Sequence, residues 1–190
     1  SSPYERICAA KIALPQSGGA TVPLLEKLPP ELRAQYEDPA AVLRPDIPWA
    51  EIRAKRGHVG VEPGQYVPFI VRLDEAGMVK FLELHEGLVI NGAFATPKGD
   101  DQQRFVIDAS PANMAFREPA KLELPSPALF AHLVVPRGAR IYIGKKDLDN
   151  FYHRFRNPPW MDPYFCLPAV WSDEVGVGGP RRRVLPSLIS

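Results

Sequence analysis

The sequence has few cysteines and no long apolar run, and both shortages exclude whole classes of protein. Its two cysteines, Cys8 and Cys166, form no CxxC pair and no spacing with histidine that is typical of a zinc site. We therefore expect two free thiols. No apolar run approaches the roughly 20 residues that cross a bilayer, and the N-terminus has no apolar core of signal-peptide length. These features predict an intracellular protein, in the cytoplasm or nucleus, without a membrane partner.

Net charge is also nearly absent, at +1, so the overall charge argues neither for nor against a nucleic-acid partner. Only local clusters are informative, and these occur at Lys145-Lys146 and at Arg181-Arg182-Arg183. The arginine run has two interpretations at this point, a solvated loop or a nucleic-acid-binding patch. The sequence also lacks GxxxxGK(S/T), which excludes a P-loop nucleotide site.

Proline is the residue in excess. The chain has 22 prolines, a share roughly twice the usual value of about 5%. Because proline ends helices and is excluded from central strands, we expect short elements and many loops. Residues 1–60 contain many of these prolines and are predicted to be a loop-rich lead-in, with a short helix over 30–36. No function is assigned to this stretch.

Apolar periodicity changes along the rest of the chain. Phe69, Leu73, Val79 and Leu82 recur at approximate helical spacing and predict a helix over 65–83, which Gly77 interrupts or divides into two helices. Short β-branched runs then predict a β-hairpin. The predicted elements after the helix are a hairpin of strands at 88–98 and 103–110 with a turn at 98–101, a helix at 126–134, a strand at 139–148, a helix at 149–155 and a strand at 163–171. The tail over 172–190 ends apolar, as if a strand were about to continue. This mixture predicts an α+β fold.

Asp147 is the first residue that suggests chemistry. It ends an apolar strand and precedes a short amphipathic helix, a position from which a carboxylate can reach a divalent cation. Asp149 lies two residues further on. Two nearby carboxylates suit magnesium, but the same pair at a helix start would also serve as caps. Both interpretations remain open on spacing alone.

The predicted hairpin carries two cations. Lys98 lies at its turn and Arg104 near the start of its second strand, where Arg104 and Asp108 are four apart and share a strand face. A lysine and an arginine on a hairpin can grip a triphosphate, the lysine as a point charge and the arginine as a bidentate fork. Ordinary surface charge on a solvated hairpin is the alternative.

Three segments together resemble a known family. Residues 95–113, with a lysine-bearing turn before R-x-x-x-D and an asparagine, resemble the fingers hairpin of reverse transcriptases. Residues 123–133 are similar to the L-P-x-P segment that follows it. Residues 145–168 resemble the first palm motif, D-(L/I/V)-x-(D/N)-(A/F)-(F/Y), and the Y-F-x-L-P strand beyond it. The order and the gaps also match, and the resemblance is to retrotransposon-type RNA-directed DNA polymerases.

The resemblance implies a fingers β-hairpin plus the partial palm of a right-hand polymerase. Asp147 would be the first catalytic, metal-binding aspartate, and the carbonyl of Leu148 a further ligand of Mg2+ or Mn2+. The partners would be an RNA or DNA template-primer and deoxynucleoside triphosphates. Such an enzyme extends a primer by two-metal nucleotidyl transfer.

The resemblance also implies a set of substrate-binding residues. Lys98 and Arg104 would bind the incoming triphosphate, and the backbone amides of Asn150 and Phe151 would help to hold its phosphates. Tyr152 falls on the steric-gate position, where a ring blocks a ribose 2′-hydroxyl. From the residues alone, Tyr152 could equally be a core aromatic.

Two departures limit the resemblance. Ser110 stands where the family often has arginine, and no Asp-Asp pair follows Asp147. We therefore expect residues 61–190 to be a partial reverse transcriptase domain, truncated before the paired-aspartate motif and inactive by itself. Two alternatives remain, a non-catalytic nucleic-acid-binding remnant of a retroelement and an unrelated α+β interaction protein.

Overall fold

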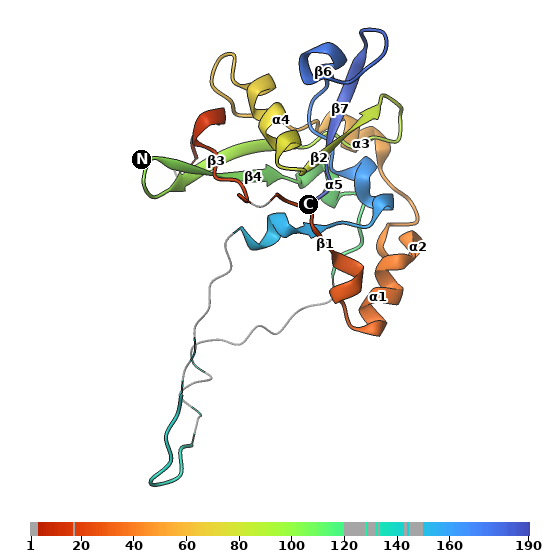
Figure 1. Cartoon of the computed structure of the whole chain (residues 1–190). Helices are drawn as coiled ribbons and strands as arrows, with labels where there is room; N and C mark the ends of the chain where they lie inside the picture. The colour runs from red at the N-terminus through yellow and green to blue at the C-terminus, as the bar shows by residue number, and fades with distance from the viewer. Residues whose placement is uncertain are drawn as a thin grey trace. The chain divides into compact units, whose positions relative to one another are not determined.

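The computed structural model describes residues 4–16, 18–119, 128, 132, 134–142, 144 and 150–190. Two compact units are present, one formed by residues 1–117 and 150–190 and the other by residues 118–149. The first unit contains helices and several small sheets, which confirms the α+β class (Figure 1). Within the described parts, no helix is both long and apolar enough to cross a membrane.

The elements are short, as the proline content predicts. The helices are η1 (Ala9–Lys11), η2 (Leu24–Lys27), α1 (Pro30–Glu37), α2 (Pro39–Val42), α3 (Trp49–Ala54), α4 (Tyr66–Glu75), α5 (Ser110–Asn113), η4 (Phe151–Arg154), η5 (Pro159–Tyr164) and η6 (Ser172–Val175). The strands are β1 (Val22–Pro23), β2 (Val79–Glu83), β3 (Gly92–Lys98), β4 (Gln102–Asp108), β5 (Phe155–Arg156), β6 (Val170–Trp171) and β7 (Arg183–Leu188).

The predicted helix over 65–83 is half right. Helix α4 buries Phe69 and Leu73, as their spacing predicts. The chain then turns at Gly77, whose φ of +69° favours glycine, and continues as strand β2. Val79 therefore lies in a strand, where it pairs with Leu188 of β7. The prediction failed after Gly77 because five residues are too few to separate a helical period from a strand period.

Strand β7 is the centre of a three-stranded antiparallel sheet, ordered β2-β7-β6. Its residues from Val184 onward are buried, and it lies at the apolar end of the tail, where the sequence suggested a strand without fixing its bounds. The strand predicted at 163–171 is mostly wrong. Its first two residues belong to η5, Cys166 makes isolated bridges, and only the two residues of β6 form a strand.

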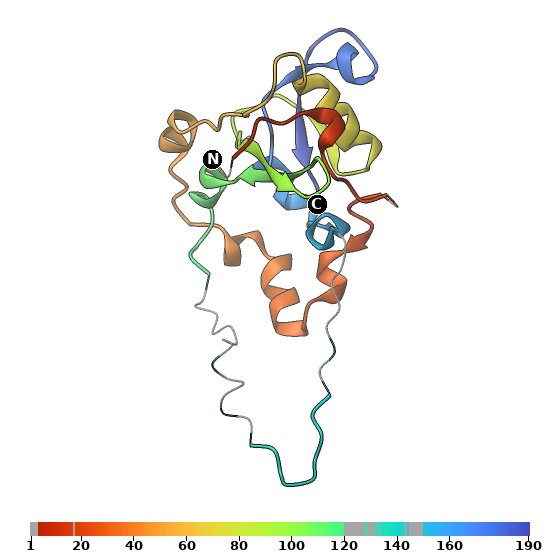
Figure 2. The same cartoon turned by 90° about the vertical axis from the view of Figure 1, so that its left-hand side faces the viewer.

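The predicted hairpin is confirmed as β3 and β4, joined by residues 99–101. Their antiparallel register pairs Ala95 with Phe105 on the buried face of the hairpin. The Phe105 ring meets Phe69 of α4 at 5.3 Å and His153 of η4 at 6.2 Å between ring centroids. Both α4 and η4 therefore pack against the buried face of the hairpin, and both views show them beside it (Figures 1 and 2).

The first 60 residues complete the core around this hairpin. Helix α1 confirms the helix predicted at 30–36. Residues on both sides of it extend the two edges of the hairpin. Bridges join Glu5 to Ala95 and Val59 to Ala93 at the β3 edge, and Ile12 to Gln103 at the β4 edge. The hairpin is therefore covered along both edges by a stretch that the sequence left without a role.

Three further predictions concern residues 118–155. The helix at 126–134 lies almost wholly outside the described residues. The strand at 139–148 is absent from its described part, residues 139–142 and 144, and the remainder is outside the described residues. The helix at 149–155 is present as the four-residue 3-10 helix η4, which follows Asn150 in a left-handed conformation with φ +49°.

A buried amide connects distant parts of this unit. The side chain of Asn91 is fully buried just before β3. Its Nδ2 donates to the carbonyl oxygens of Tyr164 at 2.9 Å and Cys166 at 3.2 Å, and its Oδ1 accepts from the amide of Ala112 at 3.2 Å. One side chain thereby joins the β3 entry to η5 and to α5.

Replacing this amide should destabilise the fold strongly. Asn91→Ala removes the side-chain partners of the Tyr164 carbonyl and the Ala112 N–H, and each such group costs about 1–3 kcal/mol when buried. We expect a loss of about 3 kcal/mol in the free energy of unfolding. Urea denaturation followed by circular dichroism measures it, with the exposed Asn113→Ala as a matched control. Equal stability of both variants would contradict this role of Asn91.

Candidate functional site

The two predicted triphosphate ligands of the hairpin share one face. The register sets Thr96 opposite Arg104 and Lys98 opposite Gln102, and directly paired residues point to the same side of an antiparallel ladder. Lys98, Arg104 and Asp108 therefore project from one face, and the spacing of Arg104 and Asp108 predicts their part of it. Arg104 is exposed, and Lys98 is half-buried. The opposite face is the buried one that carries Phe105.

The turn beside Lys98 has an unusual backbone. Asp100 and Asp101 both adopt positive φ, at +58° and +59°. The carboxylate of Asp101 accepts from the ammonium of Lys11 at 2.6 Å. The N-terminal stretch is thus tied to the hairpin tip, and one of the two aspartates next to Lys98 is neutralised.

The aromatic residues of η4 face outward. Tyr152 is 82% exposed, so the interpretation as a core aromatic is wrong. Phe151 is 40% exposed, and its ring contacts Tyr152 at 5.4 Å and Phe155 at 4.9 Å in edge-on geometry. The Tyr152 ring is therefore available at the surface, and its role as a steric gate stays a prediction. So does phosphate binding by the amides of Asn150 and Phe151.

His153 joins η4 to the hairpin. Its imidazole stacks on Phe105 with an angle of 17° between the rings, and its carbonyl accepts from the Ala20 amide at 2.8 Å. Burial lowers the pKa of His153 below its usual value, and the nearby ammonium of Lys98 lowers it further. The predicted residue Lys98 therefore lies in the neighbourhood of η4, which carries Tyr152.

The predicted metal ligands Asp147 and Leu148 lie outside the described residues, as do Lys145, Lys146 and Asp149. Among the residues that the structure describes, no three histidine, cysteine or acidic side chains gather into a possible metal site. The single aspartates after position 147 are engaged elsewhere. Asp162 pairs with Lys80, and Asp173 with Arg181 at 3.1 Å.

Both cysteines are free, as predicted. Cys166 is fully buried, and this burial raises the pKa of its thiol to about 12. A thiol with so high a pKa is a poor nucleophile at neutral pH. Cys166 is therefore a packing residue and carries no catalytic chemistry.

The arginine run belongs to a structural cluster. The Arg181 and Arg182 guanidinium groups bond to the carboxylates of Asp173 and Glu83, the latter at 2.8 Å. Arg181 and Arg183 lie over the Trp171 ring at 4.3 and 5.1 Å from its centroid. Because two of its three cations are paired with carboxylates, the run has little free charge with which to bind nucleic acid.

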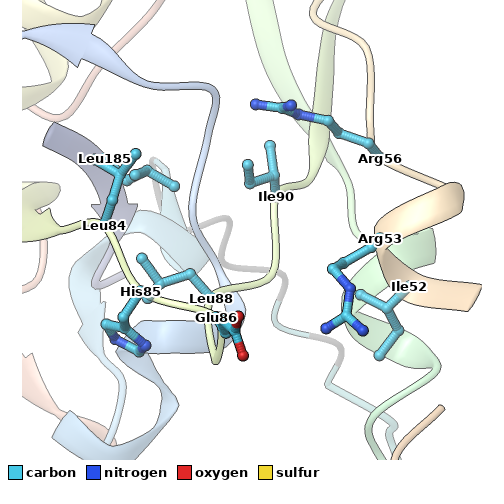
Figure 3. Close-up of a pocket in the computed structure, with 9 residues that line it drawn as sticks. All are labelled: Ile52, Arg53, Arg56, Leu84, His85, Glu86, Leu88, Ile90 and Leu185. Atoms are coloured by element: carbon cyan, nitrogen blue, oxygen red, sulfur yellow. The ribbon is translucent and has the colours of Figure 1, made fainter. Parts of the chain in front are cut away.

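A pocket of about 440 Å³ opens elsewhere, between α3, the β2–β3 connection and β7. Figure 3 shows Arg53 and Arg56 on one side of it and Leu84 and Leu185 on the other. Its other lining residues are Ile52, His85, Glu86, Leu88 and Ile90. None of the predicted site residues lines this pocket, so the predicted site is a surface on the hairpin and η4.

Sequence reasoning missed the residues that fix the hairpin in place. Gln103 is buried, and its Nε2 donates to the Glu5 carboxylate and the Arg6 carbonyl, both at 2.9 Å. A polar residue at an inward position of an alternating strand is a signal that could have identified Gln103. No comparable signal exists for Asn91, because its partners are backbone groups of distant segments.

Comparison with protein-family models, with curated proteins and with solved structures gives no match for this chain.

Acidification should loosen the junction of η4 with the hairpin. Because the folded-state pKa of His153 is lowered, the unfolded chain binds more protons as the pH falls below about 6.5, and stability drops there. We expect His153→Phe, which keeps a ring against Phe105, to lose this component of the pH dependence. Urea unfolding between pH 7.5 and 5 tests it, with His85→Gln as the control. An unchanged pH slope in His153→Phe would refute the assignment.

Proposed function

We propose that this chain is the fingers and the start of the palm of a reverse transcriptase, and that its hairpin binds the triphosphate of an incoming deoxynucleotide. The observation that carries the proposal is the position of Lys98 and Arg104 on one face of the hairpin. Arg104 is exposed, and its side chain forms no hydrogen bond or ion pair with the described residues. Helix η4 packs on the other face of the hairpin, where His153 meets Phe105. Helix η4 carries Tyr152, the proposed gate.

The chemistry of the two cations suits a triphosphate. A guanidinium group offers a planar fork that binds phosphate oxygens in pairs, whereas an ammonium group acts as a movable point charge. Phosphoryl transfer depends on positioning and on charge stabilisation, which are the tasks these groups perform. The resemblance to the fingers hairpin adds the order of the motifs, from Lys98 through Asp108 to Asn113.

The resemblance also implies a divalent metal. Carboxylate and carbonyl oxygens are the ligands that Mg2+ prefers, so Asp147 and the Leu148 carbonyl have suitable donors. Mg2+ or Mn2+ held by these groups would neutralise phosphate charge. These 190 residues carry one of the three aspartates that the resemblance implies. The proposal for this chain is therefore nucleotide binding, and primer extension needs carboxylates that this sequence does not contain.

Loss of either hairpin cation should weaken triphosphate binding. We expect Lys98→Ala and Arg104→Ala each to raise the Kd for a fluorescent deoxynucleoside triphosphate about tenfold or more, because a hydrogen bond to a charged group contributes about 1.5–3 kcal/mol. Equilibrium titration with Mg2+ measures the Kd. The exposed residues Lys27 and Arg33, changed to alanine, are the matched controls. Wild-type affinity in both hairpin variants would leave an interaction protein as the better explanation.

Tyr152 should set the preference between sugars. Removing its exposed ring in Tyr152→Ala opens the space that a ribose 2′-hydroxyl would enter. We expect the ratio of ribonucleotide to deoxynucleotide Kd values to fall toward one, while the deoxynucleotide Kd changes little. Parallel titrations with the two triphosphates measure this ratio. A ratio equal to that of the wild type would show that Tyr152 does not contact the sugar.

A further inference from the structure

The face of the hairpin that carries Arg104 also carries aromatic rings. Phe94 pairs with Val106 two residues before the Thr96–Arg104 pair, so its side chain projects from the same side of the ladder. The ring of Tyr4 meets that of Phe94 edge-on, with centroids 4.8 Å apart and planes at 86°. Tyr4 is 62% exposed. An accessible aromatic pair therefore lies next to the hairpin cations.

The N-terminal segment adds a cation to this face. Glu5 bridges Ala95, and its carboxylate bonds to the buried Gln103 side chain, so Glu5 points to the core side. Strand alternation then turns its neighbours Tyr4 and Arg6 to the opposite side, as the Tyr4–Phe94 contact confirms for Tyr4. Arg6 is exposed, and its side chain forms no ion pair or hydrogen bond with the described residues.

The segment that supplies these groups is held in place before any ligand arrives. Gln103 Nε2 donates to the Arg6 carbonyl at 2.9 Å, and its Oε1 accepts from the Cys8 amide at 2.9 Å. Glu5 and Ala95 exchange backbone hydrogen bonds of 2.8 and 3.1 Å. Binding at this face therefore need not order the chain first, which removes a large cost of association.

Charge on this face is predominantly positive. Arg6, Lys98 and Arg104 supply three cations. The acidic side chain that the hairpin places here, Asp108, accepts from the Ser110 hydroxyl at 2.6 Å and from its amide at 3.1 Å. Those bonds to Ser110 lower the pKa of Asp108, and the nearby Lys55 ammonium lowers it further, so this carboxylate stays ionised and offsets one of the three cations.

We propose that the face formed by Tyr4, Arg6, Phe94 and Arg104 binds a single strand of nucleic acid, with bases stacked on the rings and phosphates on the guanidinium groups. Exposed rings among cations are the means by which proteins hold unpaired strands. A duplex keeps its bases stacked on one another and offers these rings nothing to stack on. The face extends about 13 Å from Phe94 to Lys98, the length of about four stacked nucleotides.

Strand binding rests on the proposed function, which supplies nucleic acid as the partner. The residues that bind the strand differ in part from those that bind the triphosphate. Triphosphate binding requires Lys98 and Arg104. Strand binding adds Tyr4 and Arg6, which belong to the N-terminal segment and to no motif of the resemblance. The two proposals can therefore fail separately when strand binding is measured without nucleotide or metal.

The test is a titration of the full chain into fluorescein-labelled oligothymidylate at low salt, followed by anisotropy. We expect Tyr4→Ala to weaken binding about tenfold, because stacking contributes about 1–3 kcal/mol per base, and Tyr4→Phe to retain it. Arg6→Gln should weaken binding and reduce the slope of log K against log salt by about 0.7. Arg33→Gln, an exposed arginine on α1, is the matched control and should change neither.

Three results would overturn the proposal: equal affinity of Tyr4→Ala and wild type, equal competition by duplex and by single-stranded DNA, or equal displacement of the probe by polyglutamate. The unfolding midpoint of each variant shows whether it is folded. If Tyr4→Ala does not fold, Arg6→Gln tests the proposal in its place. If Tyr4→Ala loses strand binding but retains triphosphate binding, the loss is specific to the face that binds the single strand. Triphosphate binding that is unchanged in both Lys98→Ala and Arg104→Ala, with strand binding lost in Tyr4→Ala, would refute only the nucleotide site.

Discussion

The side chain of Asn91 holds together three segments that are far apart in the sequence, the entry to β3, the end of η5 and the start of α5. An amide has both donors and an acceptor, and here both kinds are used in a site without solvent. Because an unpaired buried polar group costs more than a hydrogen bond contributes, the three segments dock together or not at all. The position of the hairpin relative to the β2-β7-β6 sheet follows from this requirement.

A second constraint acts on the backbone beside Asn91. A Cβ atom at Gly57 would lie 2.0 Å from the amide nitrogen of Gly92, and one at Gly92 would lie 2.6 Å from the carbonyl oxygen of His58. The two backbone segments therefore cross in direct contact. Neither Gly57 nor Gly92 can carry a side chain unless the chain moves. This crossing brings Val59 to the edge of β3 and so connects the N-terminal stretch to the hairpin.

Local signals predicted the parts of the fold that local interactions determine. The hairpin followed from two β-branched runs around a polar turn, and α1 followed from a proline at its first turn. Strand β2 did not follow, because Val79 and Leu82 fit a helix as well as a strand, and pairing with β7 more than a hundred residues later decides between them. The role of the first 60 residues was equally hidden, since the hydrogen bonds that attach them to the hairpin go to distant residues, Ala95 and Gln103.

The same division applies to the candidate site. Spacing alone placed Arg104 and Asp108 on one face, and the hairpin register adds Lys98 to it. The addition of Tyr4 and Arg6 depends on a bridge across some 90 residues. Net charge carried no information, because the chain pairs many cations with carboxylates, including those of Lys11, Lys80 and Arg182. Among the described residues, Arg6 and Arg104 form no ion pair, and they lie on the face that carries the exposed Tyr4 ring and the half-buried Phe94 ring. A chain that is nearly neutral overall can therefore present a positive surface, because folding determines which cations are neutralised and which remain available to a ligand.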